Sequence, residues 1–178
     1  TSHAALCNPE ILKMMRQAGC SHLVYGYESF SPHVMKTIGK GSTPEINIRS
    51  FFWTLEAGIR PIPNQIIGFP IEDFQSMYQN MDAWKRLGIV VKPFFATPYP
   101  GSEWYSVYHS RILEQYDDDL EKFILDLGDA TRITAVISHN FNAAELLGLR
   151  ELMISFDYKR IQEYEKYWCK AHHIPEGS

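Results

Sequence analysis

The residues best suited to chemistry stand directly after short apolar segments of the sequence. Glu28 follows the segment 22–27, and Gly68 follows 65–67. A carboxylate at the position of Glu28 can accept two hydroxyl hydrogen bonds, as from a ribose diol, or it can cap a helix or form a salt bridge. A glycine at the position of Gly68 either lets the backbone approach a ligand closely or forms an ordinary turn between a strand and a helix.

Four further residues extend this candidate site. Lys40 stands between two glycines, where a lysine can reach an anion or remain solvated. Asn64 can contact a sugar hydroxyl through its amide, or it can tie down the bend at Pro63. Phe69 and Pro70 can form a wall against a flat ring.

The cysteines and histidines do not form a metal motif in the sequence. Cys7, Cys20 and Cys169 are far apart, and no C-x-x-C pair is present. These thiols do not make a disulfide framework, which favours reduced cysteines in a cytoplasmic protein. We therefore expect no metal ligands within this chain.

Helices and strands alternate through the first part of the chain and must position these residues. Pro61 and Pro63 cannot donate to a ladder, which limits the secure part of the second strand to 65–67. Strands that each follow a helix are expected to be parallel, so their carboxyl ends share one edge, where ligands bind in such folds. The predicted helices are 9–18, 32–38, 44–57 and 73–87, and the predicted strands are 22–27, 59–67 and 90–97.

The last part of the chain and the overall composition narrow the class of protein. Helices are predicted at 104–115, 117–127, 143–153 and 158–171. Hydrophobic residues make up 45% and charged residues 21%, and the net charge is −4, as in an ordinary globular domain. We expect neither a nucleic acid nor a membrane as partner, because the chain has no basic stripe and no apolar run of about 20 residues. We also expect no signal peptide at the N-terminus.

Six short segments, in this order and spacing, resemble radical S-adenosylmethionine (SAM) enzymes. The resemblance extends over about residues 10–105 and is strongest to the group whose members often carry an upstream cobalamin-binding domain. It implies an α/β fold, namely the C-terminal half (strands 4–6) of a partial TIM-type (βα)6 barrel at 1–110, followed by a helical extension at 111–178. The segments are 18–20, 26–29, 38–43, 57–59, 67–72 and 98–102.

The resemblance implies SAM as the cofactor and assigns roles to the candidate residues. Glu28, with Ser29 beside it, and Asn64 match positions that contact the SAM ribose, and Lys40 matches a residue that pairs with the SAM carboxylate in some members. The family usually has Gly where this chain has Ile71. The positions that would hold adenine are Ile66, Gly68, Phe69 and Pro70, and Tyr99 matches the exit of the sixth strand, near SAM and substrate.

The family's cluster motif C-x-x-x-C-x-x-C belongs after the first barrel strand and is absent from this sequence. The resemblance therefore implies a fragment, inactive alone, of an enzyme whose [4Fe-4S] cluster is held by residues outside this chain. In the family, the reduced cluster cleaves SAM to a 5′-deoxyadenosyl radical that attacks a small-molecule substrate. Cobalamin-dependent methylation or cyclisation is the expected reaction class.

Two other functions stay open at this point, a methylthiotransferase and a non-catalytic half-barrel for binding or assembly. A half-barrel would also leave two sheet edges and an apolar face exposed. We therefore expect the chain to self-associate through these edges.

Overall fold

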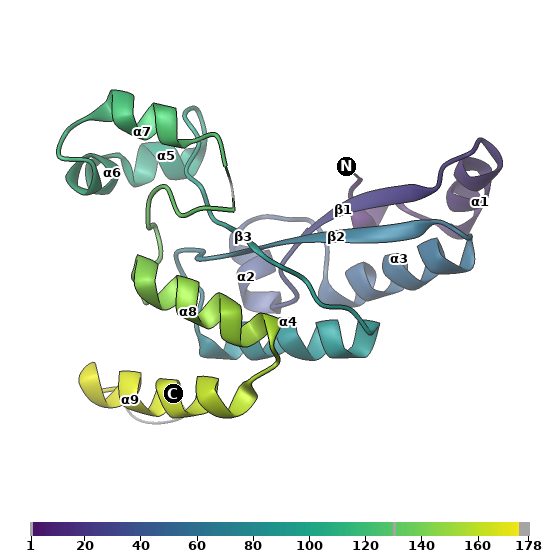
Figure 1. The fold of residues 1–178 in the computed structure, drawn as a ribbon. Helices are drawn as coiled ribbons and strands as arrows, with labels where there is room; N and C mark the ends of the chain where they lie inside the picture. The colour runs from purple at the N-terminus through teal and green to yellow at the C-terminus, as the bar shows by residue number, and fades with distance from the viewer. Residues whose placement is uncertain (1, 130, 175–178) are drawn as a thin grey trace.

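The computed structural model describes residues 2–129 and 131–174, which form a three-stranded parallel sheet with helices around it (Figure 1). The strands are β1 (His22–Glu28), β2 (Arg60–Ile67) and β3 (Phe94–Phe95), in the order β1-β2-β3. The α/β character and the parallel strands predicted from the sequence are therefore confirmed. The helices are a 3-10 turn η1 (Ala4–Leu6), α1 (Pro9–Gln17), α2 (Pro32–Thr37), α3 (Pro44–Glu56), α4 (Phe74–Leu87), α5 (Glu103–Val107), α6 (His109–Gln115), α7 (Leu120–Asp126), α8 (Ala143–Ile154) and α9 (Tyr158–Ala171).

Local capping explains why α1, α3 and α4 begin, and α4 ends, within one residue of the predicted positions. The side chain of Asn8 accepts a hydrogen bond from the third amide of α1, and Thr43 does the same for α3. Asp73 and Ser76 form a reciprocal capping box at the start of α4. Gly88 ends that helix with a φ of 66°, a conformation that favours glycine.

β2 matches the predicted strand 59–67 to within one residue, extends beyond the secure part 65–67 and includes both prolines. The amide of Arg60 donates to Ser21 on the β1 side, so alternate residues of β2, including Pro61 and Pro63, direct their nitrogens to the opposite edge. β3 meets that edge only at residues 66 and 67. The prolines therefore remove no hydrogen bond from the ladder between β1 and β2.

β3 is shorter than the sequence predicted, because the expected strand 90–97 pairs only at Phe94 and Phe95. Pro93 has no amide N–H to donate. The facing edge of β2 carries Pro61 and Pro63, which also cannot donate. A ladder between 90–93 and 61–64 would therefore lack donors on both sides.

α3 and α4 cover one face of the sheet, as Figure 1 shows. The stacked rings of Tyr25 and Tyr27 point from β1 to α3, where their hydroxyl groups lie 2.7 Å from Thr54 Oγ1 and 3.0 Å from Ser50 Oγ. From α4, the buried indole of Trp84 donates to the side chain of Gln65. Polar pairs of this kind satisfy buried hydroxyl and amide groups and fix how the helices lie on the sheet.

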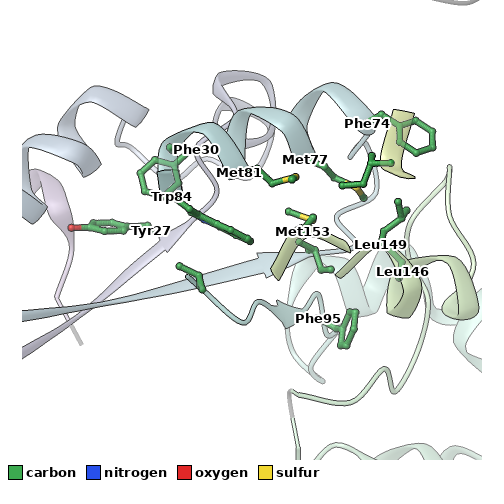
Figure 2. Close-up of a cluster of buried hydrophobic side chains, with 14 of the residues drawn as sticks. Tyr27, Phe30, Phe74, Met77, Met81, Trp84, Phe95, Leu146, Leu149 and Met153 are labelled. Carbon is green, nitrogen blue, oxygen red and sulfur yellow. The ribbon is translucent and has the colours of Figure 1, made fainter. Parts of the chain in front are cut away.

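The C-terminal helices share the core of the sheet domain. Leu146, Leu149 and Met153 of α8 lie beside Met77 of α4 and Phe95 of β3 (Figure 2). Hydrophobic residues before and after position 110 therefore belong to one cluster, and the division into 1–110 and 111–178 stays a prediction. No helix of the described part of the chain is long and apolar enough to cross a membrane.

The helix expected at 104–115 is interrupted at Tyr108 and forms α5 and α6. With α7, these helices bury a small cluster of their own around Ile112, Tyr116 and Phe123. Tyr108 itself packs against a second cluster that contains Phe69 and Ala96, at the carboxyl ends of β2 and β3. The interruption thus lies where the helical part meets the sheet.

Candidate functional site

Glu28 and Lys40 form an ion pair at the carboxyl end of β1. Lys40 Nζ lies 2.7 Å from Glu28 Oε1, and the two side chains are 21% and 22% exposed. The salt-bridge alternative for Glu28 is therefore confirmed, and its partner is the other charged candidate residue. Because both groups remain open to solvent, the pair can still receive a polar ligand.

The backbone of β1 is shaped to present this carboxylate. The register with β2 shifts between Gly26 and Glu28, as in a β-bulge, and Glu28 has a φ of 61°. Such a left-handed conformation is uncommon outside glycine and is typical of functional sites. A Cβ atom on Gly26 would lie 2.6 Å from Glu28 Oε1, so a larger residue there would displace the carboxylate from this position.

His3 fixes the loop that carries Lys40. Its Nε2 atom lies 2.6 Å from the carbonyl oxygen of Lys40, and its Nδ1 atom accepts from the amide of Ala5 at 3.2 Å. Nε2 therefore carries the proton and donates a hydrogen bond to the carbonyl oxygen of Lys40. The sequence analysis missed this residue, because no motif marks a contact between residues 37 positions apart.

Asn64 is the direct strand neighbour of Gly26 in the β1–β2 register. Its side chain is half-buried and makes no hydrogen bond to the residues that the structure describes, so it does not tie down the bend at Pro63. The structure therefore brings Asn64 to the same edge of the sheet as Glu28 and leaves its amide free for a ligand.

Ser29 is buried and engaged inside the fold. Its hydroxyl donates to Asn80 Oδ1 at 3.2 Å and accepts from the amide of Ser31 at 3.0 Å. In this conformation the side chain holds the turn after β1 against α4. A contribution of Ser29 to cofactor binding would come from its backbone or from its support of Glu28.

The turn after β2 combines a glycine of positive φ with a buried carboxyl group. Gly68 has a φ of 87°, and its amide donates to Glu72 Oε2. The other carboxyl oxygen of Glu72 has no partner among the described residues, and burial raises the pKa of this group to about 8. Glu72 therefore stabilises the turn, and it is Asp73 that caps α4.

The remaining candidates differ in exposure, two being buried and two partly exposed to solvent. Phe69 is buried with its ring edge against Trp104, 5.5 Å between centroids, and Pro70 is also buried. Ile66 is half-buried, and Tyr99 is 46% exposed. Ile66 and Tyr99 are therefore open to a ligand, whereas Gly68, Phe69 and Pro70 are buried behind them.

The described residues do not bring metal ligands together. No three His, Cys, Asp or Glu side chains within 2–129 and 131–174 could hold one ion. Cys7 lies 3.1 Å from the hydroxyl of Tyr25, and Cys20 donates to a backbone carbonyl. The residues of this part of the chain therefore do not fit an iron–sulfur cluster.

Comparison with known proteins finds relatives in sequence and in structure. No protein-family model matches the chain. An uncharacterized methyltransferase of Pyrococcus horikoshii is 34% identical over 109 residues, which are 60% of this chain and 24% of that protein. The chain thus spans about a quarter of the length of this curated relative.

A structural neighbour is TsrM of Kitasatospora setae, a radical S-adenosylmethionine methyltransferase solved with a tryptophan substrate and a SAM analogue. It is 21% identical, with a TM-score of 0.46, and the match covers 54% of this chain and 20% of TsrM. A likeness of this size carries no argument by itself.

Proposed function

We propose that this chain is the SAM-binding part of a methyltransferase of the radical SAM class. The observation that carries the proposal is the Glu28–Lys40 ion pair, with Asn64 free beside it, at the carboxyl ends of parallel strands. This edge is where small ligands bind in α/β folds. Similarity to the Pyrococcus horikoshii methyltransferase supports SAM-related methylation in a coarse sense.

The ion pair suits the two polar ends of SAM. Glu28 Oε1 is occupied by Lys40, and Oε2 can still accept hydrogen bonds from a ribose diol. The ammonium of Lys40 has two further N–H groups that can reach the carboxylate of the methionine moiety. Asn64 can add an amide contact to the ribose. When bound, SAM supplies the group that is transferred, and these residues bind and orient it.

Adenine would lie against the half-buried side chain of Ile66 in this proposal. Gly68 is buried behind it, with Leu146 of α8 where a side chain would point and Glu72 holding its amide, so its backbone supports this surface. Phe69 and Pro70 support this surface from the core. Tyr99, exposed after β3, is placed to contact a substrate.

The iron–sulfur cluster of the proposed class would need ligands beyond the described residues. The proposal therefore assigns this chain cofactor binding and leaves the reducing electron to another part of the protein. The same proposal includes cobalamin as a second cofactor, methylation or cyclisation as the reaction, and this chain as a fragment of the whole enzyme. The alternative functions are a radical SAM methylthiotransferase and a non-catalytic module for binding or assembly.

Calorimetric titration of the chain, or of a longer protein that contains it, with S-adenosylhomocysteine tests the proposal. Glu28→Gln keeps the shape of the side chain and removes its charge, so we expect affinity to fall about tenfold or more. Glu56→Gln, at the exposed end of α3, is the matched control and should leave binding unchanged.

If neither the unsubstituted chain nor the longer protein that contains it binds S-adenosylhomocysteine, the proposal is wrong. A module that does not bind SAM is then favoured. If both variants bind as the unsubstituted protein does, the site lies elsewhere. Methylation assays with the full-length protein then separate methyl transfer from methylthio transfer by the mass added to the product.

A further inference from the structure

A cavity of about 660 Å³ opens beside the carboxyl end of β2, between α6 and the start of α8. A volume of this size is typical of small-molecule pockets. Arg111 and His139 are among its lining residues. None of the residues proposed above to bind SAM lines it, so the cavity is distinct from the Glu28–Lys40 pair.

Hydrogen bonds between distant segments build the walls of this cavity. The side chain of Gln115 binds both backbone groups of Val136, donating to its oxygen at 3.0 Å and accepting from its nitrogen at 2.8 Å. On the other side, the amide of His139 donates to the carbonyl oxygen of Pro70 at 2.9 Å. The cavity is therefore a fixed feature of the fold and does not depend on one loose loop.

Tyr108 orients the imidazole of His139. The tyrosine hydroxyl lies 3.0 Å from Nε2 of the histidine. Burial raises the pKa of Tyr108, so the phenol stays protonated at neutral pH and can donate to Nε2. In the tautomer in which Tyr108 donates, the imidazole proton sits on Nδ1, which has no partner among the described residues. His139 thus offers one N–H donor.

Arg111 supplies a positive charge to the same cavity. No carboxylate of the described residues lies within 4.0 Å of its guanidinium group. Glu145 also lines the cavity, but its two oxygens accept hydrogen bonds from Tyr164 and Asn142. Glu114 also lines the cavity; it is exposed and stands one turn further along α6 than Arg111. Beside this carboxylate, the Arg111 guanidinium and the His139 imidazole are the donors without a carboxylate partner among the described residues.

We propose that this cavity binds a small anion, a carboxylate or a phosphate group, through the guanidinium of Arg111 and the imidazole of His139. A guanidinium can hold such an oxyanion with two parallel hydrogen bonds. The site is separate from the proposed SAM site and does not rest on it.

Nuclear magnetic resonance of the His139 ring signals, assigned with His139→Gln, tests this site. Sodium acetate is added to one sample and inorganic phosphate to another, with sodium chloride of equal ionic strength as the control. We expect a saturable shift that Arg111→Gln weakens about tenfold or more. Glu114→Gln, on the same helix, should leave the affinity equal or higher, because it removes a negative charge.

Saturation by acetate alone assigns the site to carboxylates, by phosphate alone to phosphates, and by both to oxyanions in general. Arg111→Lys keeps the positive charge but cannot form two parallel hydrogen bonds to an oxyanion. Its affinity for the anion should therefore lie between those of the unsubstituted chain and Arg111→Gln. A shift that does not saturate, that chloride reproduces, or that survives Arg111→Gln overturns the proposal. Glu28→Gln should not change the anion titration of the His139 signals. The outcome for this cavity is therefore independent of the outcome for the proposed SAM site.

Discussion

Two glutamates near the strand ends have opposite surroundings. Glu28 is partly exposed and paired with Lys40, whereas Glu72 is fully buried and one of its oxygens has no partner in the described part of the chain. A charge on Glu28 is balanced by the ammonium beside it and by water. A charge on Glu72 would be balanced only by backbone amides, so burial favours its protonated form.

The raised pKa of Glu72 makes stability depend on pH in a defined window. The folded chain holds this proton up to about pH 8, whereas the unfolded chain releases it near pH 4.5. The free energy of unfolding should therefore fall as the pH rises between these values, by up to about 1.4 kcal/mol per pH unit. Urea unfolding from pH 5 to 8.5 measures this slope.

Glu72→Gln removes the ionisable group while an amide oxygen can still accept from Gly68. The difference in unfolding free energy between the original chain and this variant should therefore shrink or reverse as the pH rises. Glu56→Gln, which is exposed, serves as the control and should run parallel to the original chain. Parallel curves for Glu72→Gln as well would show that its pKa is not raised.

At the scale of elements, the turn after β2 is held by packing as well as by conformation. Gly68 and Gly88 both have a positive φ, 87° and 66°. A Cβ atom on Gly68 would lie 3.1 Å from Leu146 Cδ1 of α8, whereas one on Gly88 would meet nothing within 4 Å. A side chain at Gly88 would therefore introduce backbone strain alone, whereas one at Gly68 would introduce both backbone strain and steric crowding.

We expect Gly68→Ala to destabilise the chain more than Gly88→Ala. Backbone strain costs about 1–2 kcal/mol at either position, and crowding at Gly68 adds about 1 kcal/mol or more. Urea unfolding compares the two variants. The combination of Gly68→Ala with Leu146→Ala should be less destabilising than the sum of the single changes, and strict additivity would argue against the contact.

For the molecule as a whole, the edge of the sheet formed by β1 is open. Within the described residues, the side of β1 away from β2 is paired only at the bridge from Ser2 to Tyr25. Backbone groups along such an edge can pair with another strand. Exposed apolar side chains on η1 and α1, Leu6 at 73% and Met14 at 67%, lie in the same N-terminal part.

We expect the isolated chain to self-associate through this edge. Val24 directs its carbonyl to the open side, where it accepts from Ser2, so its amide faces the same way. Val24→Pro should therefore weaken association and spare the β1–β2 ladder. Light scattering across a concentration series measures the mass, and circular dichroism checks that the variant is folded. A monomeric mass of the original chain at the highest concentration would contradict this expectation.

The sequence by itself determined the features that depend on neighbouring residues. The caps at Asn8, Thr43 and Asp73 and the glycine at 88 mark helix ends, because each involves atoms within about four residues. The alternation of helices and strands likewise predicted a parallel sheet with polar residues at one edge. These local rules also brought out Glu28 and Lys40 as candidates.

Only the tertiary structure decided how these parts meet. The bulge that turns Glu28 toward Lys40, the clamp from His3 and the short β3 all depend on strand register, which involves residues far apart in the sequence. The two prolines, which limited the secure part of the predicted strand to 65–67, are tolerated in β2 because their nitrogens face the side of β2 that has no ladder at 61–64. The cavity of Arg111 and His139 exists only because the segment before α8 folds back onto the turn after β2.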